Sequence, residues 1–345
     1  MVAIHTMTKA ASRPSLIWTA WLVVRVCGSA FGADASHSAI PNTGRDDEPT
    51  LSTGIMGVPW AFPLDEAGCK ASFEETKGRA ENGDVEAQYD LGVCYLEGNG
   101  VAKDSIEAVK WFRRAAEQGY AKAQRSLGLC YITENGVTKD EDEAVKWFRK
   151  AADQGFAKAQ YNLGGCYYEG RGVPRDKAEA VKWFRKAAAQ GFAEAQSNLG
   201  RCYHEGEGVT QDYAEAAKWL RKAAEQGHAL AQCGLGECYA ADEGVAKDEV
   251  EAAKWFRKAA DQGNDLAQGR LGVCYSQGAG VPQDYVEAHK WLDLASSQGL
   301  MEARELMSRA ELEMTAQQIA DALRLAREFM LRKVPAPGPI RPRDL

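Results

Sequence analysis

The sequence predicts an all-α protein: an α-α superhelix (solenoid) of six 36-residue helix–turn–helix repeats with helical end caps. A tryptophan recurs every 36 residues, at Trp111, Trp147, Trp183, Trp219, Trp255 and Trp291. A cysteine followed by tyrosine keeps the same step, at Cys94, Cys130, Cys166, Cys202, Cys238 and Cys274. A fixed period of this length indicates stacked two-helix units, because each unit buries its apolar faces against its neighbours. The six repeats occupy 84–119, 120–155, 156–191, 192–227, 228–263 and 264–299.

The first helix of each repeat is predicted from an apolar stripe at helical spacing. In the third repeat this stripe is Ala159, Leu163, Cys166 and Tyr167, at positions i, i+4, i+7 and i+8. Gly164 recurs in every repeat, although glycine inside a helix costs about 1 kcal/mol relative to alanine. We therefore expect the two helices of a repeat to approach each other closely at this glycine.

The second helix follows a glycine-rich turn. It begins at Asp176, and Glu179 stands three residues later, a spacing that all six repeats share. This pattern predicts an N-cap aspartate with a capping-box glutamate. The helix is expected to bury Trp183 and Phe184 and to end at Gly191, in the left-handed conformation that glycine adopts at low cost.

Segments on both sides of the repeats are expected to cap the stack. Residues 65–83 are predicted to form an N-terminal half-repeat cap, and residues 300–334 a C-terminal helical cap. The last helix should start with a capping box of Thr315 and Gln318. Its predicted apolar stripe is Ile319, Leu323, Ala326 and Phe329/Met330. Composition indicates a flexible linker over 36–64 and a disordered proline-rich tail over 335–345.

The N-terminal 35 residues are predicted to be a signal peptide. Lys9 and Arg13 precede an apolar run over 16–24, and small residues suited to cleavage follow over 30–35. This predicts an exported protein, periplasmic or secreted; the alternative is an ordinary N-terminus on a cytoplasmic protein. No stretch reaches the ~18 apolar residues of a membrane-spanning helix, so no integral membrane span is expected. The net charge of -7 does not favour nucleic acid as the partner.

The repeat, as it stands from Ala157-Lys158-Ala159-Gln160 through Gly191, resembles the Sel-1-like repeat, a relative of the tetratricopeptide repeats. The resemblance implies a non-enzymatic adaptor or scaffold that binds a protein or peptide. Two alternatives stay open: a purely structural or oligomerising repeat protein, and a cell-wall or β-lactam-acting hydrolase. The sequence leaves the partner and the oligomeric state undetermined.

No catalytic or metal-binding pattern stands out in the sequence. No serine is followed three residues later by lysine, and no H-E-x-x-H or C-x-x-C pattern occurs. Equivalent cysteines of neighbouring repeats should lie ~8–10 Å apart, the packing distance of helices, whereas a disulfide tolerates at most about 7 Å. We therefore expect buried free thiols, no cofactor, no metal and no catalytic residue.

Some positions of the first helix differ from repeat to repeat, so the fold does not require one residue type there. By resemblance to tetratricopeptide arrays, these positions face a concave groove, and the partner-binding residues are predicted to be Tyr89, Arg125, Leu129, Tyr161, Tyr168, Arg201 and His204. The alternative is neutral drift on an exposed helix face. The third repeat is the one clearly basic repeat, with seven Lys/Arg against three Asp/Glu, and an acidic partner would fit there.

Overall fold

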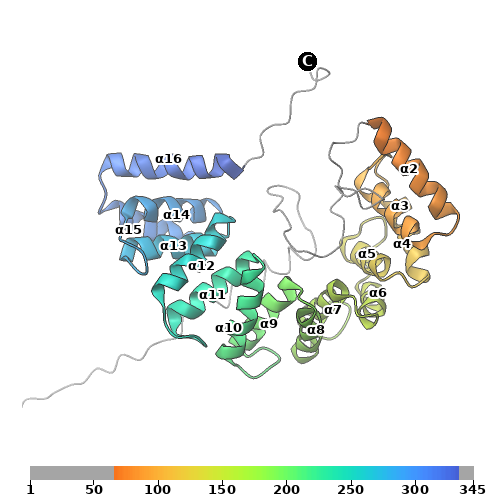
Figure 1. Ribbon diagram of the computed structural model, residues 1–345, viewed down its shortest axis with the longest axis horizontal. Helices are drawn as coiled ribbons and strands as arrows, with labels where there is room; N and C mark the ends of the chain where they lie inside the picture. The colour runs from red at the N-terminus through yellow and green to blue at the C-terminus, as the bar shows by residue number, and fades with distance from the viewer. Residues whose placement is uncertain (1–65, 334–345) are drawn as a thin grey trace, which may run out of the picture.

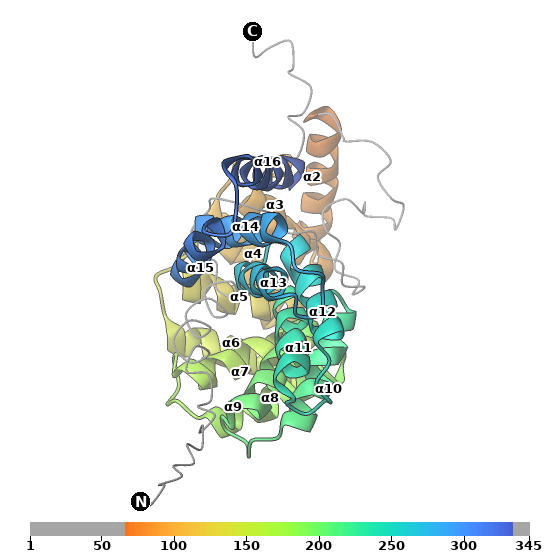
Figure 2. The ribbon, with the colours of Figure 1, turned by 90° about the vertical axis from the view of Figure 1, so that its left-hand side faces the viewer.

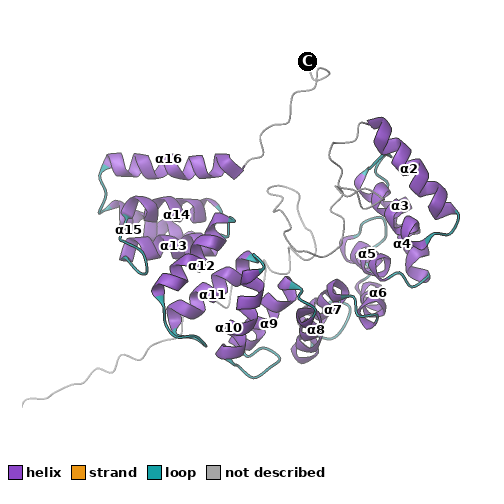
Figure 3. Cartoon of the chain, viewed as in Figure 1, coloured by secondary structure: helices purple, strands orange, loops and turns teal. Residues whose placement is uncertain are grey.

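The computed structural model describes residues 66–333, and within this range all fifteen regular elements are α-helices (Figure 3). The predicted all-α fold is confirmed. The predicted signal peptide, the predicted linker and the proline-rich tail lie outside the described residues. The described helices include none that is long and apolar enough to cross a membrane.

Each repeat consists of two antiparallel helices, here called A and B. The A helices are α3 (Val85–Glu97), α5 (Ala121–Thr133), α7 (Ala157–Glu169), α9 (Ala193–Glu205), α11 (Ala229–Ala241) and α13 (Asp265–Gln277). The B helices are α4 (Ser105–Glu117), α6 (Glu141–Asp153), α8 (Lys177–Ala189), α10 (Tyr213–Glu225), α12 (Glu249–Asp261) and α14 (Tyr285–Ser297). Helix α2 (Glu66–Glu81) precedes repeat 1, and α15 (Met301–Glu311) and α16 (Ala316–Lys333) follow repeat 6.

The helices stack in chain order along an arc (Figure 1), and from α2 to α15 each packs mainly against its neighbours in sequence. In the first half of the arc, α5 and α7 lie on the inner side and α6 and α8 on the outer side. At the end of the arc, α16 lies over α14 (Figure 2). The fold is therefore a solenoid with helical segments beyond both terminal repeats.

The recurring glycine of each A helix marks close contact with the B helix of its own repeat, as predicted. A Cβ atom added to Gly164 would lie 2.7 Å from the ring of Phe184, and one added to Gly200 would lie 2.8 Å from Leu220. Real Cβ atoms do not come this close to their neighbours, so a side chain at this position would force the two helices apart.

The predicted aspartate caps are present, but the expected capping box is not. The carboxylate of Asp176 accepts the backbone N–H of Glu179 at 2.9 Å, and the other five B helices begin in the same way. Glu179 does not return to Asp176, because the backbone N–H of Asp176 already donates to the carbonyl of Tyr167. The glutamate binds Lys182 of the next turn instead, at 2.7 Å.

The glycines after the B helices adopt the predicted left-handed conformation. Their φ angles run from 88° at Gly155 to 98° at Gly299. This conformation turns the chain out of the B helix and into the next A helix within two residues. Every B helix thus begins at a capping aspartate and ends before a left-handed glycine, and these two signals keep the repeat at 36 residues.

Candidate interaction surface

A ladder of buried glutamines holds each A helix in place. In repeat 3, Gln160 donates its Nε2 to the carbonyl of Ala152 at 3.2 Å and accepts from Gln190 at 2.8 Å. The glutamine pair recurs in all six repeats, as Gln88/Gln118, Gln124/Gln154, Gln160/Gln190, Gln196/Gln226, Gln232/Gln262 and Gln268/Gln298. Since each buried amide bonds to the B helix before it and to the B helix after it, the A helices are held at a constant spacing.

The basic residues of the B helices contact other side chains of the same chain. Arg185 donates to the hydroxyl of Tyr203 in the next repeat at 2.9 Å, and Nζ of Lys186 lies 3.7 Å from the centre of the Trp183 ring. Both contacts recur along the array. The positive charges in the K-W-F-R-K runs therefore contact tyrosine, tryptophan and glutamate side chains of the same protein.

The seven predicted binding residues occupy three positions of the A helices, spaced i, i+4 and i+7 and therefore on one side of each helix; this surface is here called the variable face. Five of them are partly buried: Tyr89, Arg125, Leu129, Tyr161 and His204. The other two, Tyr168 and Arg201, are only 3% and 5% exposed. The fold was expected not to depend on these positions, whereas in the structure they pack against neighbouring repeats.

Aromatic residues of the variable face rest on the B helices. The ring of Tyr161 lies 5.8 Å from that of Phe184 and 5.3 Å from that of Phe192. Tyr89 takes the same position in repeat 1, 5.7 Å from Phe112. These contacts fix the rings, and rigid partly buried tyrosines are typical of surfaces that bind proteins.

Polar residues of the variable face pair across the boundary between repeats. Arg125 donates its Nε to the amide oxygen of Asn162 at 2.9 Å, and Asn198 donates to the hydroxyl of Tyr161 at 3.3 Å. The partners are 37 residues apart, one repeat plus one residue. The identity of a residue at one position therefore depends on the residue at the next position in the following repeat.

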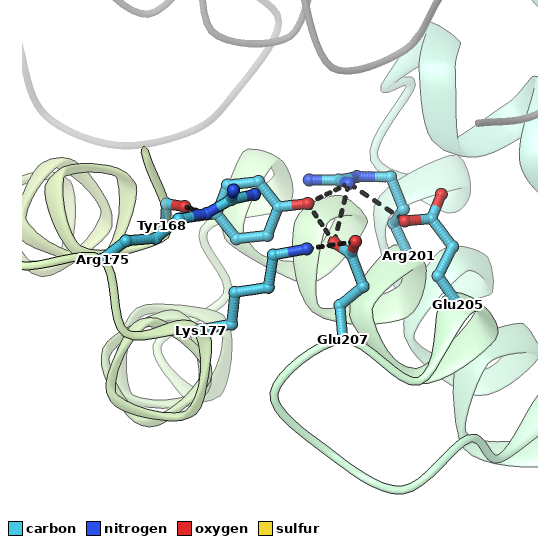
Figure 4. Close-up of polar contacts among 6 residues, drawn as sticks. All are labelled: Tyr168, Arg175, Lys177, Arg201, Glu205 and Glu207. Carbon is cyan, nitrogen blue, oxygen red and sulfur yellow. Dashed lines mark hydrogen bonds and ion pairs between the residues drawn. The ribbon is translucent and has the colours of Figure 1, made fainter. Parts of the chain in front are cut away.

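A buried ionic cluster joins repeats 3 and 4 (Figure 4). Arg201 lies 2.8 Å from the hydroxyl of Tyr168 and 3.3 Å from the carboxylate of Glu205. Glu207 accepts from both Tyr168 and Lys177, and it lies 3.7 Å from Arg201. The guanidinium also stands 4.9 Å from the centre of the Tyr168 ring. Two cations and two carboxylates thus meet around one tyrosine hydroxyl.

Burial and pairing set the charges of this cluster. Burial raises the pKa of Tyr168, so its hydroxyl remains a donor at neutral pH. Burial also raises the pKa of Glu205, and the positive charge of Arg201 only partly opposes this. Burial acts on Glu207 in the same sense, but hydrogen bonds from Lys177 and Tyr168 outweigh it, so the pKa of Glu207 is lowered. Glu207 is therefore the ionised centre of the cluster.

Pairs of polar side chains continue along the variable face beyond the cluster. His204 lies 2.7 Å from Glu243 of repeat 5, and Arg270 donates to Glu237 at 2.7 Å across the next boundary. Burial raises the pKa of Glu237, and Arg270 opposes this rise. Repeat 4 is thus joined to repeat 5 by a histidine–glutamate contact, and repeat 5 to repeat 6 by an arginine–glutamate ion pair.

The repeated cysteines lie inside the array as free thiols. Cys130, Cys166, Cys202, Cys238 and Cys274 are buried, and Cys94 is partly buried. Burial raises the pKa of the Cys166 thiol to about 12 and that of Cys202 to about 11. At neutral pH these thiols are protonated, so they act as small apolar residues of the core.

Several residues of the variable face were missed in the sequence analysis. They are Asn162, Asn198, Glu207, Glu243 and Arg270, each bonded to a residue of a neighbouring repeat. A usable signal was present, because opposite charges or bonding partners recur 33 or 37–39 residues apart. A search for pairs offset slightly from the 36-residue period would have found them.

A family model described as Sel1 repeat matches six consecutive segments of the chain, 85–120, 121–156, 157–192, 193–228, 229–264 and 265–300. The chain belongs to the Sel1 repeat family. The resemblance found in the sequence is confirmed. Sel1 repeat proteins are generally protein-interaction scaffolds, and such scaffolds are typically non-enzymatic.

Solved structures of Sel1 repeat proteins share this fold. One is c5321, a protective antigen present in uropathogenic Escherichia coli strains, which is 42% identical with a TM-score of 0.67. That match covers 75% of this chain and 56% of c5321. Another is a Sel1 repeat protein from Oxalobacter formigenes, 35% identical with a TM-score of 0.58, over 68% of this chain and 97% of that one.

A short stretch of the chain is similar to a curated protein. Over 44 residues it is 46% identical to the secretory immunoglobulin A-binding protein EsiB of Escherichia coli O6:H1. The match covers 13% of this chain and 9% of EsiB. The chain therefore spans about half of the length of c5321 and about a tenth of the length of EsiB in these matches.

Proposed function

We propose that this Sel1 repeat protein is a scaffold that holds a protein or peptide partner against the variable face, in the concave groove of the solenoid. The proposal rests on a contrast between positions that recur in every repeat and positions that vary between repeats. The core, cap and glutamine-ladder positions recur along the array, while the A-helix positions of the variable face change in every repeat. Because the same scaffold carries different side chains along the variable face, this face is suited to recognise a particular partner.

The seven residues have two roles in this proposal. The partly buried residues Tyr89, Arg125, Leu129, Tyr161 and His204 contact the partner. Tyr168 and Arg201 are too deeply buried for direct contact, and instead they hold repeats 3 and 4 in the orientation that the partner meets. The likeness to an immunoglobulin A-binding protein and to a protective antigen supports a protein partner met outside the cell, as does the predicted signal peptide.

A capture experiment with two matched variants tests the proposal. The full chain is used as bait, with Arg125→Gln, Leu129→Gln and His204→Gln combined in one variant, which leaves the packed tyrosines in place. The control replaces Lys146, Lys182 and Lys218 by glutamine; these side chains are 67%, 65% and 56% exposed on the B helices. Circular dichroism is used to check that both variants keep their helices.

The expected result is a partner recovered by the wild type and by the lysine variant but not by the first variant. Loss of contact residues of this kind weakens binding by about 2 kcal/mol or more, roughly thirtyfold. Equal recovery by all three proteins would place the partner elsewhere on the chain. Recovery of no partner, together with self-association of the chain, would favour the alternative of an oligomerising repeat protein.

A further inference from the structure

The two ends of the stack each present a helix with one open side. Helices within the repeats pack against a neighbour on each side, whereas α2 packs mainly on α3 and α16 mainly on α14. Each of these two terminal helices therefore has an inner face, which contacts the array, and an outer face, which is turned away from it (Figure 1). The residues on the outer faces determine what can bind at the ends of the solenoid.

The outer face of α16 is apolar and basic. Leu323, Met330 and Leu331 are 44%, 48% and 64% exposed. Arg327 is also exposed and lies three or four residues from each of them, on the same side of the helix. Among the described residues of α16, the ion pairs do not include Arg327. Exposed apolar side chains grouped around a cation are typical of a surface that binds another protein.

The outer face of α2 carries acidic and small residues. Ala71, Glu74, Glu75 and Gly78 are all exposed and stand at i, i+3, i+4 and i+7, on one side of the helix. Within residues 66–333, neither of these two glutamates forms an ion pair. A Cβ atom added to Gly78 would meet no other atom within 4 Å, so an incoming side chain has room above the backbone. The outer faces of α2 and α16 are therefore complementary in charge and in side-chain size.

We infer that the outer face of α16 binds the outer face of α2 of a second copy of this chain, so that the solenoids associate head to tail. Large side chains of one helix then pack over small residues of the other, and Arg327 faces Glu74 and Glu75. Two α16 faces would bring Arg327 against its own copy, and two α2 faces would bring glutamates together. Repulsion between like charges disfavours both symmetric pairings.

A contact between two different faces has consequences for the size of the assembly. Each bound copy still presents one outer face of each kind at the ends, so association is not limited to two copies. The contact involves the ends of the array, so it does not rest on the proposed function. A single helix pair buries less than the about 1,200–2,000 Å² of stable interfaces, so the dissociation constant should be roughly micromolar or higher.

Sedimentation velocity of the full chain, from about 1 μM to about 500 μM, measures this association across micromolar dissociation constants. The average mass should rise with concentration and pass that of a dimer. It should fall again as salt is added, because salt screens exposed charges. A wild-type chain that stays monomeric over the whole range would contradict the inference.

Two charge-reversal variants each disable one end of the chain. Arg327→Glu alters the α16 face, and Glu74→Lys with Glu75→Lys alters the α2 face. Each should raise the dissociation constant roughly tenfold or more, because like charges then face each other. A mixture of the two variants should associate again, because each supplies the face that the other lacks. The matched control Lys182→Glu reverses a charge that is 65% exposed on α8, and it should associate as the wild type does.

The same variants separate this contact from other uses of the α16 face. Loss of association in Arg327→Glu, with association kept in the α2 variant, would assign the contact to two α16 faces and overturn the head-to-tail arrangement. Binding of phosphatidylglycerol vesicles by a monomeric wild type, but not by Arg327→Glu, would assign the α16 face to a lipid surface instead. Circular dichroism checks the helices of each variant, and recovery of association in the mixture requires that both are folded.

Discussion

Hydrogen bonds between single side chains determine which repeats are compatible as neighbours. Arg125 needs an acceptor at Asn162, and Tyr161 needs a donor at Asn198, each one repeat further along. A buried polar group that loses its partner costs about 1–3 kcal/mol, so a change at one of these positions favours a matching change in the next repeat. The variable face therefore varies in linked pairs, and not residue by residue.

Asp90 provides a test at this scale through pH. Burial, together with the nearby carboxylate of Glu86, raises the pKa of Asp90 from 3.8 to about 6. Since the folded pKa lies above the unfolded value, the contribution of Asp90 to stability is full below pH 3.8 and is lost as the pH rises through about 6. Asp90→Asn should raise the free energy of unfolding at pH 7 by about 1–2 kcal/mol, a figure reduced for the solvent contact that the carboxyl keeps.

Urea denaturation of the wild type and of Asp90→Asn at pH 4.5 and pH 7 measures this effect. Asparagine fits the site, because Asn162 and Asn198 hold the same position in repeats 3 and 4. The control Glu97→Gln removes an exposed carboxylate at the other end of the same helix and should change stability by only a few tenths of a kcal/mol. An identical pH dependence in the wild type and Asp90→Asn would show that Asp90 titrates normally.

Some of these residues could be assigned from the sequence, and others could not. Asp176 and Gly164 were assigned correctly because capping and close packing depend on local geometry that a single repeat reveals. Tyr168 and Arg201 were expected at the binding surface because their positions differ between repeats and because tyrosine and arginine are typical of binding hot spots. Their burial follows from a contact across the repeat boundary, which the sequence of one repeat does not reveal.

Among the elements, the terminal helices differ most from the repeats. Trp291 is 1% exposed, whereas its equivalent Trp183 is 8% exposed. The difference comes from α16, whose Phe329 ring lies 5.2 Å from that of Trp291 in an edge-to-face arrangement. Ala326 joins the same cluster. Helix α16 thus covers the apolar face that repeat 6 would otherwise present to solvent.

Phe329→Ala should therefore loosen the C-terminal end of the array. Loss of the ring should cost about 2–3 kcal/mol, below the range for a fully buried phenylalanine because Phe329 is only partly buried. The matched control is Met330→Ala, whose side chain is 48% exposed on the next residue and should cost less than about 0.5 kcal/mol. Tryptophan fluorescence during urea denaturation measures both, and equal losses would mean that α16 does not pack through Phe329.

The position of this cap was predicted from sequence, but part of its buried stripe was wrong. Leu323 and Met330 were expected inside, yet they are 44% and 48% exposed, and Ala322 is buried instead. Alanines on the inner face let α16 approach α14 closely, so the helix turns its small residues inward. Hydrophobicity alone favours the larger side chains, and only the shape of the facing helix decides between the two stripes.

At the scale of the whole molecule, the cluster around Arg201 holds the two halves of the array together at the boundary between repeats 3 and 4. Arg201→Ala would leave the partly buried carboxylate of Glu205 without its cation, whereas Glu207 keeps its pairing with Lys177, so the expected cost is about 2–3 kcal/mol. Because repeats are coupled only to their neighbours, the two halves should then unfold separately. We expect the thermal transition to split or broaden clearly in calorimetry.

Arg185→Ala is the matched control for this prediction. Arg185 also bonds a tyrosine across the boundary of repeats 3 and 4, at 2.9 Å, but its side chain is exposed to solvent. Its loss should cost less than about 1 kcal/mol and leave a single transition. A sharp transition with an unchanged midpoint in Arg201→Ala would mean that the cluster does not couple the two halves.

The turn glycines have a further consequence for how such a chain can change in length. Gly136, Gly172 and the equivalent glycines pack their backbones directly against the first carbonyl of the B helix in the preceding repeat, in the same way at each joint. A gene duplication or deletion of 36 codons would therefore preserve every one of these backbone joints. The side-chain pairs tolerate it unequally: a cut between repeats 3 and 4 separates Tyr168 from Arg201. Recombination within such a gene should thus be tolerated least where polar pairs of the variable face cross the cut, as they do between repeats 3 and 4.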